Sequence, residues 1–231
     1  MTAPLRLVDA READGFAAFL ARLLRWDKAA VVRLRASGTV LAVFGQPPFG
    51  GGVLAVRTAE LDGDAGDLDS TVSAGQLLDG IDDVTGTVAV PPAVTGPAWA
   101  GLLPPRGGWE QVPGLPSAED VRAVAAAAVS EFRDRSEALR PESRTRAELD
   151  AIADDIWSRR LGGTGLPLRV VHAAHALGFL RPVRTAVPAP RTAEQPAVLL
   201  LAAGPWLRLR TPYGSVAVRR GLPGLSVSPV R

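Results

Sequence analysis

Residues 1–90 change from a helical hydrophobic pattern to a pattern typical of strands. Over residues 9–25, apolar side chains recur three and four positions apart, which predicts an amphipathic helix. Three valine-bearing runs follow, at 30–35, 40–44 and 53–57, and short turns with glycine or proline separate them. Short strands joined by such turns predict an antiparallel β-meander.

The remainder of this N-terminal part is less regular. An acidic loop at 60–69 leads to a short helical pattern at 73–78 and a strand at 87–90. We therefore predict that residues 1–90 form an α+β domain with one long helix and an antiparallel meander.

Residues 91–116 predict an irregular connector. They contain seven prolines and little periodicity. Trp99 and Trp109 argue against a disordered linker, because large aromatic side chains favour burial. We expect both indoles to hold the connector against a neighbouring domain.

Residues 117–231 predict three helices followed by a β-hairpin. Helical patterns begin at Ser117, Thr145 and Pro167, and the first two residues are good N-caps. A proline-rich loop at 181–196 follows the third helix. Strand-like runs then occupy 198–203, 206–210 and 215–220.

This order of elements resembles that of winged-helix domains. The resemblance is one of topology over about residues 117–220, and it rests on no sequence motif. It implies that the third helix enters the DNA major groove and that the hairpin forms a wing on the DNA backbone. The outer face predicted for this helix offers Arg169, Ala173, Ala176 and Leu180, a set poorly suited to reading bases, so the expected sequence specificity is low.

Composition narrows the class of protein. The 231 residues are 47% hydrophobic, which excludes general disorder, and no apolar run reaches the roughly 18–20 residues of a membrane span. The first residues lack the features of a signal peptide, so we expect a cytoplasmic protein without a membrane partner. Because cysteine is absent, disulfides and thiolate catalysis are excluded. One lysine, one tyrosine and no asparagine indicate a GC-rich bacterial source.

Charge is distributed unevenly along the chain. Residues 1–116 contain 9 Lys and Arg against 13 Asp and Glu, and residues 117–155 contain 6 against 10. Residues 156–231 contain 11 arginines and a single acid, Glu194. Such asymmetry predicts a surface for an anionic partner at the C-terminal end.

The predicted hairpin gathers arginines on one face. Strand side chains alternate, so Leu207 and Leu209 point to one side and Arg208 and Arg210 to the other. Guanidinium groups bind phosphate in a bidentate manner, whereas a merely solvated sheet face is the alternative interpretation. The candidate nucleic-acid-binding residues are Arg208, Arg210, Arg219 and Arg220 with Trp206 in the hairpin, and Arg159, Arg160 and Arg169 in the helices.

Catalytic and metal-binding motifs are weak. His172 and His175, with Asp154 and Asp155, could be metal ligands, but the pattern lacks the H-E-x-x-H form. His175 falls on the predicted apolar arc, where a core histidine is the commoner role. We therefore predict no metal, no cofactor and no enzymatic activity.

The leading hypothesis from the sequence is a non-enzymatic bacterial regulator of transcription that binds DNA or RNA phosphates through a winged-helix-like domain. The alternative hypothesis is a protein-interaction or assembly module, without nucleic acid, whose basic face docks on an acidic partner. That partner could be a second copy of the chain, including in a homodimer.

Overall fold

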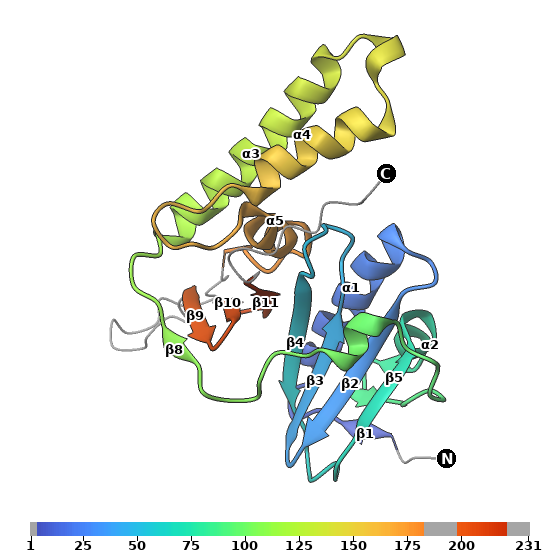
Figure 1. Ribbon diagram of the computed structural model, residues 1–231. Helices are drawn as coiled ribbons and strands as arrows, with labels where there is room; N and C mark the ends of the chain where they lie inside the picture. The colour runs from blue at the N-terminus through green and yellow to red at the C-terminus, as the bar shows by residue number, and fades with distance from the viewer. Residues whose placement is uncertain (1–3, 183–197, 221–231) are drawn as a thin grey trace.

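The computed structural model describes residues 4–182 and 198–220, and its main feature is one antiparallel sheet of eight strands (Figure 1). The strands come from both halves of the chain. In spatial order they are β5 (Asp69–Ser73), β2 (Val31–Ser37), β3 (Val40–Gly45), β4 (Leu54–Glu60), β11 (Gly214–Arg219), β10 (Trp206–Thr211), β9 (Leu199–Ala203) and β8 (Glu110–Gln111).

Helices pack against one face of this sheet. The helix α1 (Arg11–Trp26) contacts β4, and α5 (Leu168–Ala176) contacts β10 and β11. The short helix α2 (Ala74–Asp79) packs on α1 and β2. A small sheet of β1 (Leu5–Arg6), β7 (Thr87–Val88) and β6 (Ile81–Asp82) borders α1.

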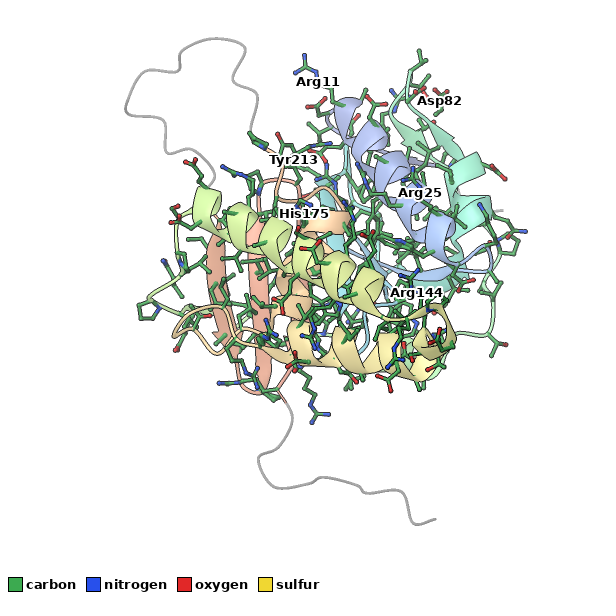
Figure 2. All side chains as sticks on the ribbon, turned by 90° about the horizontal axis from the view of Figure 1, so that it is seen from above. Arg11, Arg25, Asp82, Arg144, His175 and Tyr213 are labelled. Atoms are coloured by element: carbon green, nitrogen blue, oxygen red, sulfur yellow. The ribbon has the colours of Figure 1, made fainter. Side chains whose placement is uncertain are left out.

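Two further helices form a hairpin that extends away from the sheet (Figure 1). They are α3 (Ala118–Ala138) and α4 (Arg146–Ser158), and a 3-10 turn, η2 (Pro141–Ser143), lies between them. Ser117 and Thr145 cap α3 and α4 as predicted, because each hydroxyl accepts a backbone N–H. Arg144 marks the far end of this helical hairpin in Figure 2.

Pairing of β4 with β11 joins the two halves of the chain. Val56 lies opposite Ser215 and Ala55 opposite Val216, although each pair is separated by more than 150 residues. The β10–β11 hairpin is therefore an internal part of the sheet and has strands on both sides. A wing that could reach DNA would need to be free of such neighbours, so the winged-helix detail of the prediction is wrong.

The helix-facing side of the sheet forms the main core. Val32 and Leu34 of β2 and Leu209 and Val216 of the hairpin are all buried in it. Beside this core, aromatic rings link four helices and a loop in the order Trp26, Phe49, His172, Trp157 and Phe132, with successive centroids 4.1–6.1 Å apart. This chain of rings connects α1 to the helical hairpin.

The connector covers part of the opposite face. After η1 (Ala98–Gly101) it crosses the sheet and ends in β8 at the far edge (Figure 1). Trp99, Leu103 and Trp109 pack against a second apolar cluster of Leu54, Ala217 and Trp206. Trp206 is only 6% exposed as a result, although the sequence placed it on a solvated face.

The α+β class and the antiparallel meander are confirmed, and the helical and hairpin patterns of the second half form where predicted. The short strands β1, β5, β6 and β8 were not predicted in these positions. The third helix ends at Ala176, short of the predicted 180, because Gly178 adopts a φ of 71°. The proline-rich loop predicted over 181–196 lies beyond the described residues from 183 onward. Within the described ranges, no helix has the length and hydrophobicity to cross a membrane.

Candidate functional site

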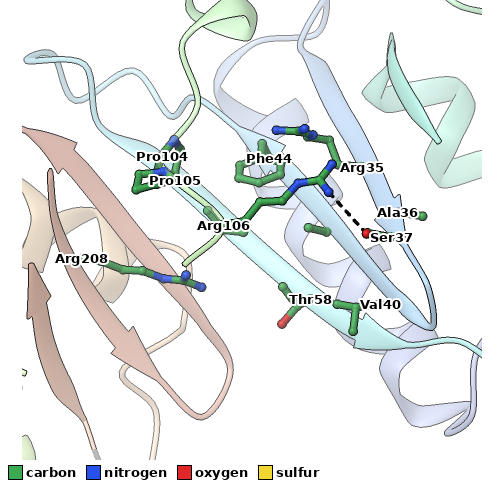
Figure 3. A pocket seen from close by; sticks show the side chains of 12 residues that line it. Arg35, Ala36, Ser37, Val40, Phe44, Thr58, Pro104, Pro105, Arg106 and Arg208 are labelled. Atoms are coloured by element: carbon green, nitrogen blue, oxygen red, sulfur yellow. Dashed lines mark hydrogen bonds between the residues drawn. The ribbon is translucent and has the colours of Figure 1, made fainter. Parts of the chain in front are cut away.

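Three arginines surround a cavity of about 250 Å³ on the helix-free face of the sheet (Figure 3). We call this cavity the arginine groove. Strands β2, β3 and β4 form its base, β10 forms one side, and the connector forms the other. It is lined by Arg35, Arg106, Arg208, Ser37 and Thr58, by the apolar side chains Ala36, Val40, Ala42, Phe44 and Val56, and by Pro104 and Pro105.

Arg208 reaches the groove because its neighbours on β11 are small. It pairs with Ala217 in the register of the hairpin, and Ser215 is the next residue on the same face. Nε of Arg208 donates a hydrogen bond to Oγ of Ser215 at 2.8 Å, and the guanidinium lies 5.5 Å from the ring centre of Trp109. Burial, and then the charge of Arg210, lower the pKa of Arg208. The protein thus holds a partly desolvated cation here.

The other two arginines enter the groove from β2 and the connector. Nη1 of Arg106 donates a long hydrogen bond of 3.3 Å to Oγ of Ser37. Asp69 is engaged by Arg33 through bonds of 2.7 and 2.9 Å, and its pKa is lowered mainly by these bonds. Nε of Arg35 stays 3.5 Å from Asp69 and has no hydrogen-bond partner among the described residues. Arg35 therefore shares the carboxylate of Asp69 with Arg33 as an ion pair, without a hydrogen bond from its buried Nε to any residue that the structure describes.

A second cavity of about 270 Å³ continues the arginine groove beyond Arg208 and Thr58, which line both. It lies beside the part of β4 that extends beyond its pairing with β11. Arg210 and Arg57 line this extension, but Arg57 donates to Glu12 at 2.6 Å and to the carbonyl oxygen of Tyr213. Burial lowers the pKa of Arg57 despite the carboxylate of Glu12.

The groove has the chemistry of an anion-binding site with an apolar floor. Among the described residues that line it, none is acidic and none is a histidine. Guanidinium groups hold carboxylates and phosphates, whereas Phe44, Val56 and Ala42 offer apolar contact beside them. The lining provides positive charge and shape, without a side chain suited to proton transfer near neutral pH.

The predicted alternation of the hairpin is confirmed by its register. Arg208 and Arg210 share the helix-free face with Arg219, which pairs with Trp206. Arg210 and Arg219 are exposed. Arg220 is exposed too, but its Nη2 donates to the carbonyl oxygen of Gly204 at 2.5 Å.

The three arginines predicted on helices lie elsewhere and have partners within the chain. Arg159 donates to Glu131 at 2.7 and 2.9 Å and to Asp155 at 2.8 Å, which raises its pKa. Arg160 donates to a backbone carbonyl at 2.8 Å. Arg169 packs against the loop at Gly51 and lies 3.6 Å from Asp154. The structure does not bring these three to the hairpin arginines.

The helix expected to read DNA is covered by the protein itself. α5 packs between the sheet and helices α3 and α4. Its supposed outer face includes Ala173, which is fully buried, and Leu180 beyond its end is buried as well. A helix enclosed in this way has no face to place in a groove of DNA, so the interpretation as a winged-helix regulator of transcription is wrong.

The structure encloses the other histidine than the one that the sequence placed in the core. His172 is the enclosed one, with its ring stacked on Trp157 and against Phe49, whereas His175 is exposed. Burial lowers the pKa of His172 to about 4, and the nearby charge of His175 adds to the effect. No cluster of three potential metal ligands occurs among residues 4–182 and 198–220.

Arg35 and Arg106 were missed as site residues. Alternation over 30–35 does place Arg33 and Arg35 opposite the buried Val32 and Leu34, which is a signal visible in the sequence. Their convergence with Arg208 needs the pairing of β4 with β11, for which the sequence carries no local signal.

Comparison with known proteins yields two family models and distant structural matches. No curated protein matches the chain. Two crystal structures of the DNA polymerase sliding clamp from Pseudomonas aeruginosa, one with ligand, are 12% identical with TM-scores of 0.45. The alignments cover 97% and 96% of this chain but 66% of the clamp, so the chain spans just under two thirds of the clamp's length. Neither these matches nor the family models include a winged-helix protein.

The two family models divide the chain within the predicted connector. The model described as "Domain of unknown function (DUF8010)" matches residues 1–101. The model described as "Domain of unknown function (DUF8185)" matches residues 104–223, which is just over half of the chain. The protein therefore belongs to the DUF8185 family.

Proposed function

We propose that the protein is a non-catalytic protein-interaction module whose arginine groove binds an acidic segment of a partner protein. The proposal includes the cytoplasmic location expected from the sequence. The observation that carries this proposal is that Arg208 is partly buried without a carboxylate partner in the described part of the chain. This guanidinium is partly buried, opens on a groove with two further arginines, and has no carboxylate within 4.0 Å among the described residues.

A partly buried guanidinium without a carboxylate partner favours an anionic ligand on energetic grounds. Desolvation of a guanidinium costs free energy, and a carboxylate in direct contact offsets that cost. The lowered pKa of Arg208 is the sign of this desolvation. A carboxylate that arrives from a partner would form charge-assisted hydrogen bonds in a site with reduced access to water.

The shape of the groove favours a peptide segment. The main cavity and its extension meet at Arg208 and Thr58, so an extended chain could follow both. Phe44 and Val56 provide apolar contact beside the charges. Arginine and aromatic residues are also the types enriched in the energetically important parts of protein interfaces.

Fluorescence anisotropy tests this proposal with a labelled peptide of alternating glutamate and leucine, and with a lysine–leucine peptide as a control for charge. We expect binding of the acidic peptide alone, and a weaker affinity at high salt. Arg208→Ala should weaken binding about tenfold or more, and Arg208→Lys by less, since lysine keeps the charge but not the bidentate geometry.

Arg133→Ala is the matched control, because Arg133 is an exposed arginine of α3 outside the groove. Thermal melts of all variants would show that each is folded. Absence of binding to the acidic peptide, or an equal loss with Arg133→Ala, would overturn the proposal.

A further inference from the structure

We infer that the groove receives the β6–β7 turn of a second copy of this chain, with Asp83 and Val84 as the inserted residues. The inference rests on the proposed function, because it names the partner that supplies the acidic segment. It also gives the protein a means of self-assembly.

Charge complementarity within the chain supports this choice of partner. Residues 58–105 contain eight Asp and Glu residues and no Lys or Arg. The turn that joins β6 and β7 lies within this acidic stretch. Opposite charge would steer such a turn toward a groove with three arginines and no acid among its lining residues.

The turn also presents the most exposed large apolar side chain of the described residues. Val84 is 86% exposed, whereas Val8, the next in rank, is 59% exposed. Isolated exposed valines are common, but this one directly follows the acidic pair Asp82 and Asp83. An apolar side chain beside a carboxylate matches a groove with an apolar floor beside guanidinium groups.

The turn is held in a fixed conformation before any contact forms. Oδ1 of Asp82 accepts hydrogen bonds from the backbone N–H groups of Val84 at 2.9 Å and Thr85 at 3.1 Å. These bonds lower the pKa of Asp82, led by those from Thr85. The carbonyl oxygen of Gly86 accepts from the N–H of Leu7 at 2.9 Å and anchors the end of the turn. A preorganised turn loses little conformational entropy on binding.

The roles of the two carboxylates differ accordingly. The carboxylate of Asp82 is engaged within its own turn. Asp83, the next residue, therefore supplies the carboxylate for Arg208 of the other copy. Val84 would then contact Phe44 and Val56 on the floor of the groove. The cavity of about 250 Å³ has room for one aliphatic side chain with a carboxylate beside it.

The contact must join different copies. β6 packs against α1, which covers one face of the main sheet, whereas the arginine groove lies on the helix-free face (Figure 3). Asp82 lies at the periphery of the molecule in Figure 2. Each copy therefore carries a turn and a groove on different surfaces, and such a head-to-tail contact forms closed rings or open chains.

Sedimentation velocity over a series of protein concentrations tests the inference. A contact made by one turn buries less than the roughly 1,200 Å² of a standard interface, so we expect a weak, concentration-dependent assembly that salt disrupts. The turn variant Asp83→Lys and the groove variant Arg208→Glu should each raise the dissociation constant by about tenfold or more. Asp67→Lys makes the same charge change at an exposed acid outside the turn and should leave assembly intact.

Mixing the two defective variants gives the sharpest test. This mixture uses the neutral substitutions Asp83→Ala and Arg208→Ala, because the two charge reversals would attract each other. The first variant keeps an intact groove and the second keeps an intact turn, so the mixture should form one-to-one dimers and nothing larger. A chain that stays monomeric at every concentration, or a mixture that stays monomeric while the unsubstituted chain assembles, would overturn the inference. Acidic-peptide binding that still depends on Arg208 would show that the proposed function survives this failure.

Discussion

The imidazole ring of His172 stacks on the indole of Trp157, with ring centroids 4.1 Å apart and planes inclined by 21°. The ring of Phe49 also contacts this imidazole in an edge-on arrangement, with centroids 4.6 Å apart. Nδ1 of His172 is buried and has no hydrogen-bond partner among the described residues. This enclosure holds the imidazole in its neutral form and links a loop of the N-terminal half to two helices of the C-terminal half.

The first prediction concerns the pH dependence of stability. The pKa of His172 falls from 6.5 to about 4 on folding, so the unfolded chain binds the proton more tightly. This contribution to stability is complete above pH 6.5 and is lost as the pH falls toward 4, by up to roughly 3 kcal/mol. Urea unfolding between these pH values measures it. His172→Phe should flatten the dependence, whereas an unchanged slope in that variant would contradict the assignment. His175→Gln removes only the smaller cause of the shift and should leave most of the slope.

The second prediction concerns Gly15 of α1. A Cβ atom at Gly15 would lie 2.2 Å from Nη2 of Arg57, which is only 7% exposed and is bonded to Glu12. Gly15→Ala should destabilise the protein by about 1–3 kcal/mol, although alanine favours a helix by about 1 kcal/mol. Gly75→Ala in α2 meets no atom closer than 3.7 Å and should be neutral or slightly stabilising. Equal free energies of unfolding for the two variants would contradict this account.

The third prediction concerns Gly214 at the start of β11. Its φ of 147° is unfavourable for other residues, and a Cβ would lie 2.7 Å from the ring of Phe179. Gly214→Ala should cost about 2 kcal/mol or more of unfolding free energy. A double-mutant cycle with Phe179→Ala separates the steric clash from the backbone strain. Removal of the ring relieves the clash, whereas the strain from the φ angle remains. Gly163→Ala, in open space without positive φ, is the neutral control.

The fourth prediction concerns the attachment of the connector. Trp206 lies beneath Trp99 and Trp109, so Trp206→Ala should cost about 3 kcal/mol and loosen the connector over the sheet. Trypsin should then cleave faster after Arg106. Trp157→Ala removes an indole from the helical hairpin and should leave this cleavage rate unchanged; equal acceleration in both variants would show global unfolding instead.

The sequence predicted several helices correctly because helical spacing and N-caps depend only on residues close together in the chain. The apolar spacing in 9–25 and the hydroxyl groups of Ser117 and Thr145 are properties of neighbouring residues. The short strands β1, β6 and β8 have only two residues each, so they carry no measurable alternation. Such strands form only because a longer partner lies beside them.

The sequence predicted the part of the candidate site that lies in the hairpin. Strand alternation placed Arg208 and Arg210 on one face opposite Leu207 and Leu209, and the register confirms it. The same reasoning made that face solvated, yet Trp206 on it is buried beneath the connector. Alternation determines which side chains share a face, but burial depends on what lies over that face.

The sequence by itself determined the α+β composition, the alternation of the hairpin and the concentration of basic charge near the C-terminus, because each is a property of residues close together in the chain. Tertiary structure alone decided that Val56 lies opposite Ser215, that the hairpin is internal to the sheet, and that Arg35, Arg106 and Arg208 converge. The physical reason is that strand pairing uses backbone hydrogen bonds, and every residue except proline carries the same backbone donor and acceptor whatever its side chain. The pairing partner is therefore chosen by the packing of the whole chain.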